Sequence, residues 1–312
     1  MTLAALAAQA AAHWGGRPLA LIRNRENAVF RMELPGGRRA ALRLHRQGYQ
    51  SASAIGSELW WCGALAAQGL PVPRPLPGRD GGLLMRLAGG RLASAVEWLP
   101  GDPLGEAGKP LAAPVEMQLR RHHALGRLLA RIHDATDAMQ MPGTFDRPCW
   151  GLDGLLGDTP FWGRFWEHPA LTAPEAARMA GVRLALRDRL AGALQGQVPA
   201  PVHADVLREN VLVAGETLSL IDFDDCGTGF RLYDLGTVLS QNLYEAAREE
   251  IRAALIEGYS TLRPADPALV DLFTLARTLA SVGWTMPRLA PDDPVNRSHI
   301  ARALLCADRV LG

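Results

Sequence analysis

The densest group of potentially reactive side chains lies between residues 201 and 225. Asp205 and Asn210 are five residues apart, and Asp222 follows in Ile221-Asp222-Phe223-Asp224. The apolar runs 211–213 and 218–221 flank an Ala-Gly-Glu-Thr turn, which predicts a β-hairpin. Asn210 would enter this hairpin and Asp222 would leave it at the same open end, where opposite Cα atoms lie about 4.5–5.5 Å apart.

This spacing brings an amide oxygen and a carboxylate together, and hard cations such as Mg²⁺ prefer oxygen ligands. We therefore predict that Asn210 and Asp222 hold Mg²⁺. Asp205 lies in the loop at the same end, placed to accept a proton from a hydroxyl group that attacks a metal-bound phosphate. The alternative is that these side chains only form turns and caps, but the hairpin followed by Asp-Phe-Asp favours the chemical interpretation.

The elements that must position these residues fall into two groups. Residues 19 to 98 predict strands with one helix between them: a hairpin from 29–34 and 39–44, a helix over 57–68 that ends at Gly69, and a hairpin from 83–87 and 92–98. After about residue 99 most of the pattern is helical, as in Leu125, Leu128, Leu129 and Ile132. We predict a small β-rich lobe over 1–98, a hinge near 97–101 and a larger helical lobe over 99–312.

Composition excludes several classes of protein. Lys and Arg number 33 and Asp and Glu 32, so a net charge of +1 gives no electrostatic reason to expect nucleic acid or an anionic membrane as partner. The four cysteines are scattered and form neither a zinc pattern nor a disulfide framework, which fits a reducing cytoplasm. The alanine-rich residues 1–12 predict an amphipathic or docking helix rather than a signal peptide, and no apolar run predicts a membrane span.

Two motifs resemble those of a known family. His203-Ala204-Asp205 with Asn210, and Ile221-Asp222-Phe223-Asp224, resemble the catalytic loop and metal motif of the aminoglycoside phosphotransferase and choline kinase superfamily, distant relatives of protein kinases. Residues 126–133 resemble the helix before that loop. The resemblance implies an α+β, bilobal protein-kinase-like fold, with a small antiparallel β-sheet lobe that binds nucleotide and a larger, mainly helical lobe that carries the catalytic loop and acceptor site.

The resemblance also implies roles in the larger lobe. Asp205 would be the catalytic base or the residue that orients the hydroxyl group, and Asn210 and Asp222 would hold Mg²⁺. His203 would brace the loop, and Asp234 would tie the loop down from the next helix. Asp224 and Asp225 would either assist with metal or substrate or be exposed turn carboxylates.

In the small lobe, Arg43 occupies the place of the phosphate-binding lysine of protein kinases, because Lys109, the only lysine, lies outside the lobe. Arginine offers a forked donor to phosphate oxygens. Glu58 would be the ion-pair partner of Arg43, although a surface salt bridge is an equal alternative. Asn27, in Arg25-Glu26-Asn27-Ala28, would lie in the phosphate-covering loop, and backbone groups of Glu97 and Leu99 would contact adenine.

Aromatic residues at 150 and 161–166 predict core rather than a stacking wall for substrate, and His122 and His123 predict solvated or capping side chains. The function expected is an ATP- and Mg²⁺-dependent phosphotransferase that acts on a hydroxyl group of a small molecule: an alcohol, amino alcohol, hydroxy amino acid or sugar. Its partners would be a nucleotide and that acceptor, with the oligomeric state left open. The alternatives are a protein Ser/Thr kinase of the bacterial stress-response type, a catalytically weak nucleotide-binding pseudokinase, and a metallohydrolase that uses His203, Asp205, Asp222 and Asp224.

Overall fold

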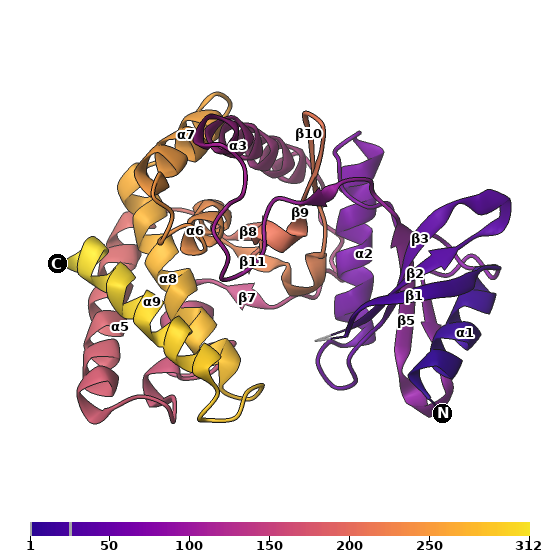
Figure 1. Cartoon of the computed structure of the whole chain (residues 1–312), viewed down its shortest axis with the longest axis horizontal. Helices are drawn as coiled ribbons and strands as arrows, with labels where there is room; N and C mark the ends of the chain where they lie inside the picture. Colours follow the sequence, from indigo (N-terminus) through magenta and orange to yellow (C-terminus); the bar gives the residue numbers. More distant parts are fainter. Residues whose placement is uncertain (1, 25–26) are drawn as a thin grey trace. The chain divides into compact units, whose positions relative to one another are not determined.

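The structure is a computed structural model that describes residues 2–24 and 27–312. The chain forms two compact units, whose elements are labelled in Figure 1. The first unit comprises Met1–Asp102, Met139–Arg147 and Leu212–Asp224, and the second comprises Pro103–Ala138, Pro148–Val211 and Asp225–Gly312. Each unit is therefore assembled from segments that are discontinuous in sequence.

The first unit is built on an antiparallel five-stranded sheet of order β1-β2-β3-β5-β4. Its strands are β1 (Arg17–Asn24), β2 (Ala28–Glu33), β3 (Arg39–Leu44), β4 (Leu84–Arg86) and β5 (Leu92–Glu97). Both predicted hairpins, β2–β3 and β4–β5, are confirmed. The alternation in β2 buries Ala28, Phe30 and Met32 in a core shared with the alanine face of helix α1 (Leu3–His13), as expected for a strand with one buried face.

Helix α2 (Ala52–Ala67) packs in the same unit and begins before the predicted residue 57. It begins early because the Ser51 hydroxyl accepts a hydrogen bond from the Ala54 amide at 3.0 Å, which caps the first turn. It ends as predicted at Gly69, whose φ of +75° is the left-handed conformation that glycine adopts readily. The predicted hairpin after residue 210 is also present, as β9 (Val211–Ala214) and β10 (Thr217–Leu220) joined through Gly215.

The second unit is mainly helical. Its helices are α3 (Val115–Asp137), α4 (Leu152–Leu156), α5 (Ala173–Ala193), α6 (Leu232–Ser240), α7 (Arg248–Ser260), α8 (Pro267–Thr285) and α9 (Pro294–Leu311). A small sheet of order β7-β11-β8 is formed by β7 (Cys149–Trp150), β8 (Ala200–Val202) and β11 (Gly227–Gly229), and the two-residue strand β6 spans Asp102–Pro103. Trp150, Trp162 and Phe165 are buried in its core, which confirms the prediction for these three residues. Phe161 is exposed, so the prediction is wrong for this residue.

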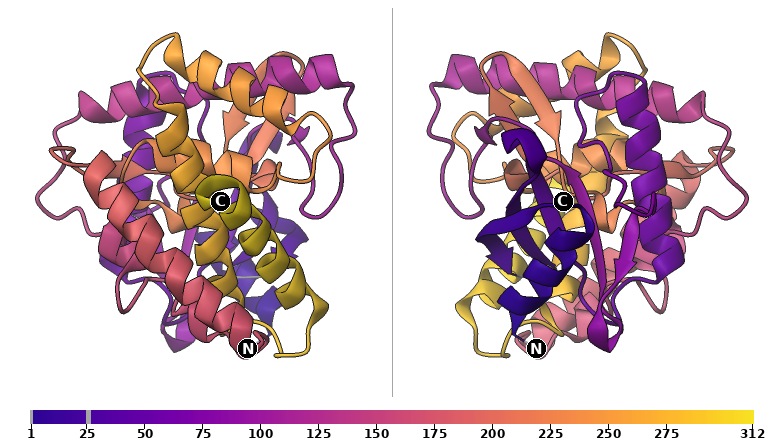
Figure 2. Two further views of the ribbon diagram at one scale, coloured as in Figure 1. Left: turned by 90° about the vertical axis from the view of Figure 1, so that its left-hand side faces the viewer. Right: turned by 90° about the vertical axis from the view of Figure 1, so that its right-hand side faces the viewer.

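Helices α3 and α7 run side by side (Figure 2) and pack very closely. A Cβ atom on Gly126 would lie 2.1 Å from the Leu255 carbonyl oxygen, and one on Gly258 would lie 2.0 Å from the His123 carbonyl oxygen. This packing corrects the prediction for His122, which is fully buried rather than solvated, with Nδ1 2.7 Å from the Gln118 carbonyl oxygen. Burial lowers the pKa of His122 to about 4.

Among the residues that the structure describes, none of the helices combines the length and the apolar character needed to cross a bilayer.

Candidate active site

The loop that carries Asp205 is anchored by one buried carboxylate. Asp234, fully buried near the start of α6, accepts hydrogen bonds from the amides of His203 at 3.0 Å and of Ala204 at 2.7 Å. Ala204 has a φ of 63°, a conformation that costs an L-residue roughly 1–2 kcal/mol. The two hydrogen bonds to Asp234 offset that strain and hold the loop in a single shape.

Asp234 is itself held by a histidine that the sequence analysis had not singled out. His133, near the C-terminal end of α3, contacts Asp234 Oδ2 through Nε2 at 3.0 Å and the Tyr259 hydroxyl through Nδ1 at 2.9 Å. Burial opposes ionisation of Asp234, but the hydrogen bond from His133 and the His203 amide outweigh it and lower the pKa of this carboxyl. His133 is the last residue of the segment 126–133, which resembles a helix of the family. The resemblance gave no role to this histidine.

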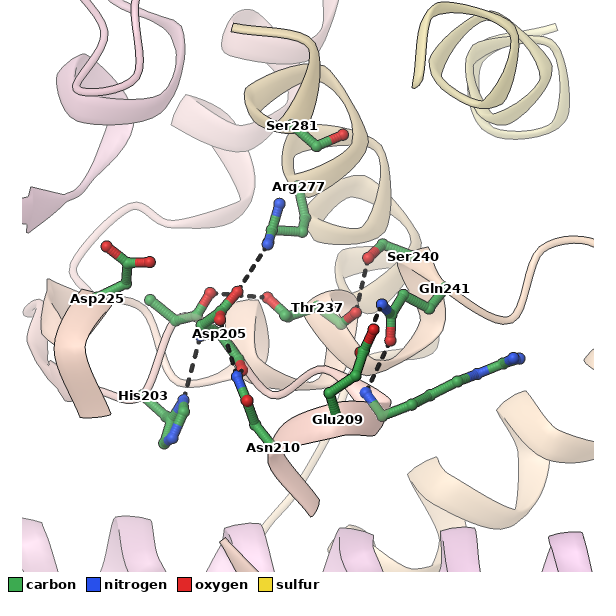
Figure 3. A network of polar contacts seen from close by, with 12 residues as sticks. His203, Asp205, Glu209, Asn210, Asp225, Thr237, Ser240, Gln241, Arg277 and Ser281 are labelled. Carbon is green, nitrogen blue, oxygen red and sulfur yellow. Dashed lines mark hydrogen bonds and ion pairs between the residues drawn. The ribbon is translucent and has the colours of Figure 1, made fainter. Parts of the chain in front are cut away.

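The Asp205 carboxylate is fixed from two sides (Figure 3). Its Oδ1 accepts from Arg277 Nη2 at 2.8 Å, and its Oδ2 accepts from Asn210 Nδ2 at 2.9 Å. The Asp205 amide donates to His203 Nδ1 at 3.2 Å, which gives His203 the contact that a bracing role requires. The amide nitrogen of Asn210 also donates to the Asp205 backbone carbonyl at 2.9 Å, so Asn210 contacts Asp205 at two points.

Arg277 is the site residue that sequence reasoning missed. It lies on α8, is 5% exposed, and its guanidinium carbon is 4.8 Å from the centroid of the Trp162 ring. The last part of the chain resembles the family only loosely, so no motif marked this arginine. A usable signal existed nonetheless, because a single arginine inside the apolar helix 267–285 implies a partner for its buried charge.

In the first unit, Arg43 lies in the middle of β3 among three carboxylates. Its Nη1 is 2.5 Å from Glu58 Oε1 and 3.8 Å from Asp224 Oδ1, and its Nη2 is 3.4 Å from Asp222 Oδ1. Glu58 is 2% exposed, so the alternative of a surface salt bridge is wrong and the pair is buried. Burial disfavours the charge on Arg43, but Glu58 and the two aspartates outweigh it and raise the pKa of Arg43.

Asp224 corrects another expectation, because it is buried rather than an exposed turn residue. Burial and the negative charge of Glu58 raise the pKa of Asp224 to about 7, against the opposing effect of Arg43. Arg147 donates to the Asp224 backbone carbonyl and also to the Ala54 carbonyl at 3.1 Å, which fixes the chain just after Asp222. Asp225 is half-buried and belongs to the second unit.

The residues of this cluster fit a cation. Asp224 Oδ1 and Glu58 Oε2 are buried without a hydrogen-bond partner, and three carboxylates face Arg43. No ready-made cluster of three or more His, Cys, Asp or Glu metal ligands occurs within 2–24 and 27–312. Asn210 and Asp222 belong to different units, so their predicted pairing around Mg²⁺ stays a prediction.

The remaining predicted nucleotide contacts lie in the first unit. Asn27 is buried and accepts a hydrogen bond from the Arg46 amide at 2.9 Å, whereas Arg25 and Glu26 lie outside the described residues. Glu97 ends β5, and its amide donates to the Arg74 carbonyl at 2.8 Å. Only the carbonyl of Glu97 and the backbone of Leu99 therefore stay as predicted adenine contacts.

Two features define the class of protein-kinase-like phosphotransferases. One is a sheet that carries a buried arginine–glutamate pair, and the other is a helical unit in which a buried aspartate anchors the Asp205 loop. The family model of the phosphotransferase enzyme family matches residues 19–273, and the chain belongs to this family.

Three relatives illustrate the match. A homoserine kinase of Rhizobium johnstonii is 32% identical over 235 residues, which cover 72% of this chain and 65% of that protein, slightly under two thirds of its length. The structure of a microcompartment-associated aminopropanol kinase is 27% identical, covers 98% of this chain and 97% of the other, and has a TM-score of 0.84. An amicoumacin kinase solved with AMP-PNP and Ca²⁺ is 19% identical, covers 93% and 88%, and shares the fold with a TM-score of 0.71.

These findings confirm the predicted superfamily, the α+β protein-kinase-like fold and the enzyme class, that of a kinase.

Proposed function

We propose that the protein transfers the γ-phosphoryl group of ATP, with Mg²⁺, to a hydroxyl group of a small molecule. Relatives named for homoserine and for aminopropanol support an acceptor of this size. The observation that carries the proposal is the Asp205 carboxylate, held at 2.8 Å by Arg277 and at 2.9 Å by Asn210 on a loop anchored by Asp234. A carboxylate held so firmly is suited to orient a hydroxyl group and to take up its proton.

The reaction balances with Asp205 as proton acceptor. The acceptor oxygen forms a bond to the γ-phosphorus while the bond from that phosphorus to the β,γ-bridging oxygen breaks, and ADP leaves with the bond electrons. The proton of the attacking hydroxyl group passes to a carboxylate oxygen of Asp205. Asn210 and Arg277 keep the carboxylate in place during the transfer.

The surplus of carboxylates around Arg43 supports a role for Mg²⁺. Asn210 and Asp222 would hold the ion, and bound Mg²⁺ would supply neutralisation of the phosphate oxygens. Arg43, oriented by Glu58 at 2.5 Å, would present its guanidinium to the nucleotide phosphates. Asn27, the Glu97 carbonyl and the Leu99 backbone complete the proposed nucleotide contacts, and a cytoplasmic location stays a prediction.

The test compares turnover and nucleotide binding in one variant. We expect Asp205→Asn to lower kcat by roughly 10²- to 10⁴-fold, because it removes the proton acceptor but keeps the shape of the side chain. Stabilisation by Mg-ATP, measured as a rise in Tm, should be kept. Asp153→Asn is the matched control, since Asp153 is 87% exposed and pairs with Arg187 on the surface.

Four outcomes would contradict the proposal. Wild-type turnover in Asp205→Asn would exclude Asp205 as the base, and absence of any shift with ATP, GTP or AMP-PNP would exclude a kinase. Nucleotide binding without phosphorylation of any small hydroxyl compound or protein serine would favour a pseudokinase. Phosphorylation of protein but not of small molecules would favour a protein kinase.

A further inference from the structure

A second arginine, Arg302, lies near Arg277, and none of the described carboxylates forms an ion pair with it. Arg302, on α9, donates from Nη2 to the Ser281 hydroxyl at 3.2 Å and lies 3.0 Å from His299 Nδ1. Ser281 is one helical turn from Arg277 on α8, and both side chains are drawn in Figure 3. The Ser281 contact therefore places the Arg302 guanidinium close enough to Arg277 for the two positive charges to interact.

The charges at this position do not balance. Arg277 pairs with Asp205, whereas none of the carboxylates within 2–24 and 27–312 forms an ion pair with Arg302. The Nε atoms of Arg277 and Arg302 are both buried and have no hydrogen-bond partner. Burial, followed by the positive charge of Arg277, lowers the pKa of Arg302 to about 10. A guanidinium in this position is destabilised unless an anion joins it.

Aromatic rings lie beside the two arginines. The Trp162 ring lies under Arg277 at 4.8 Å, and Trp284 stacks on His299 with ring centroids 6.4 Å apart. Burial and the charges of Arg302 and Arg277 lower the pKa of His299 to about 3, so this ring stays neutral and supplies no compensating charge. A cationic group placed here would be repelled by Arg302, and a carboxylate would be attracted.

We propose that Arg302, supported by Arg277, Ser281 and His299, forms an anion-binding subsite for a carboxylate of the phosphoryl acceptor, whose hydroxyl group lies against Asp205. This inference rests on the proposed kinase function and narrows its acceptor to hydroxy acids and hydroxy amino acids. A planar guanidinium suits this task because it donates two parallel hydrogen bonds to a carboxylate. An amino alcohol, which has a positive charge and no carboxylate, leaves the subsite empty.

The experiment uses three acceptors that differ by one group each: homoserine, 4-hydroxybutyrate, which lacks the amine, and 3-aminopropan-1-ol, which lacks the carboxylate. We expect the wild-type protein to phosphorylate the carboxylate-bearing compounds with a kcat/KM at least roughly tenfold above that of the amino alcohol. Arg302→Gln should raise the KM of the carboxylate compounds roughly 10- to 100-fold, and leave the KM of ATP and the rate with the amino alcohol unchanged. Arg302→Lys should restore part of the loss.

The control is Arg309→Gln, since Arg309 lies on the same helix but is exposed and donates to the Leu243 carbonyl at 2.9 Å. An equal change for all three acceptors, or a wild-type preference for the amino alcohol, would overturn the subsite. A Tm and circular dichroism spectrum like those of the wild type would show that Arg302→Gln is folded.

Failure of the proposed function is distinguishable from failure of the subsite. If none of the acceptors is phosphorylated although AMP-PNP binds, the kinase proposal fails for these compounds. The subsite is then tested by the rise in Tm that homoserine or 4-hydroxybutyrate produces in the presence of Mg²⁺ and AMP-PNP. A rise in the wild type that is lost in Arg302→Gln supports the subsite, and an equal response of the two proteins, including none, overturns it.

Discussion

Two clusters of buried charge differ in sign. Around Arg43 in the first unit, Glu58, Asp222 and Asp224 supply three carboxylates against Arg43 and the nearby Arg147. In the second unit, Arg277 pairs with Asp205, and the nearby Arg302 forms no ion pair with a carboxylate of the described residues. The first cluster therefore has a surplus of carboxylates, and the second contains an arginine without a carboxylate of its own.

In each cluster, the surroundings disfavour the charged form of one side chain: Asp224 in the first and Arg302 in the second. Burial and Glu58 raise the pKa of Asp224 to about 7, and burial and Arg277 lower the pKa of Arg302 to about 10. Arg43, which is outnumbered by carboxylates, has a raised pKa instead. Under the two proposals above, a ligand of opposite sign would complete each cluster: a divalent cation in the first, and an acceptor carboxylate in the second.

The largest effect on the free energy of unfolding is expected when Arg43, the arginine among the three carboxylates of the first cluster, is replaced. Arg43→Met leaves the buried Glu58 carboxylate without its partner, and we expect a loss of roughly 3–5 kcal/mol in the free energy of unfolding. Urea denaturation measures this loss. Adding Glu58→Gln should recover much of it, because the orphaned charge is then removed. A single-variant loss under about 1 kcal/mol, the value typical of surface pairs, would contradict the buried-pair interpretation.

The proposal that Mg²⁺ binds at the first cluster is tested by substitution of Asp222. Asp222→Asn should raise the Mg²⁺ concentration that gives half-maximal activity roughly 10- to 100-fold, since a charged ligand becomes a neutral one. Wild-type activity should disappear with a chelator and return with added Mg²⁺. Asp80→Asn is the control, because Asp80 is an exposed carboxylate of the same unit. An unchanged Mg²⁺ requirement would remove Asp222 from the proposed ligands.

Substitutions of Arg277 and Arg302 should change different kinetic constants. Arg277→Gln loosens the Asp205 carboxylate, and we expect kcat to fall about tenfold, equivalent to about 1.4 kcal/mol, with the KM of ATP unchanged. Arg302→Gln should instead act on the KM of the acceptor. If both variants change only kcat, then both arginines position Asp205 and the second cluster has no role in binding the acceptor.

The smallest effect is expected for His122, a buried histidine outside both clusters, and it concerns how the stability of the protein depends on pH. The pKa of His122 is about 4 in the folded chain and 6.5 when exposed, so its neutral form is favoured by folding. The stabilisation is complete above about pH 6.5 and is lost as pH falls toward 4, by at most about 1.4 kcal/mol per pH unit. Urea denaturation at several pH values should show a smaller slope in His122→Gln. The half-exposed His123→Gln is the control, and equal slopes in both variants would contradict the assignment.

Local sequence patterns determined much of what was predicted. The hairpin β2–β3, the end of α2 at Gly69 and the hairpin between Asn210 and Asp222 depend on turn residues and alternation over a few positions. The loop residues were recognised for the same reason, because Asp205, Asn210 and Asp222 lie within one short stretch of chain. Interactions between neighbours in sequence are fixed by backbone geometry, whatever the rest of the chain does.

Tertiary structure alone decided the charge surroundings. His133 and Arg277 reach the site from α3 and α8, and the burial of Glu58, Asp224 and His122 depends on which elements pack over them. The ionisation of a side chain reflects the sum of burial and of all nearby charges. That sum is set by residues distant in sequence, so spacing along the chain identified the reactive groups, and only packing decided the sign of the charge around each of them.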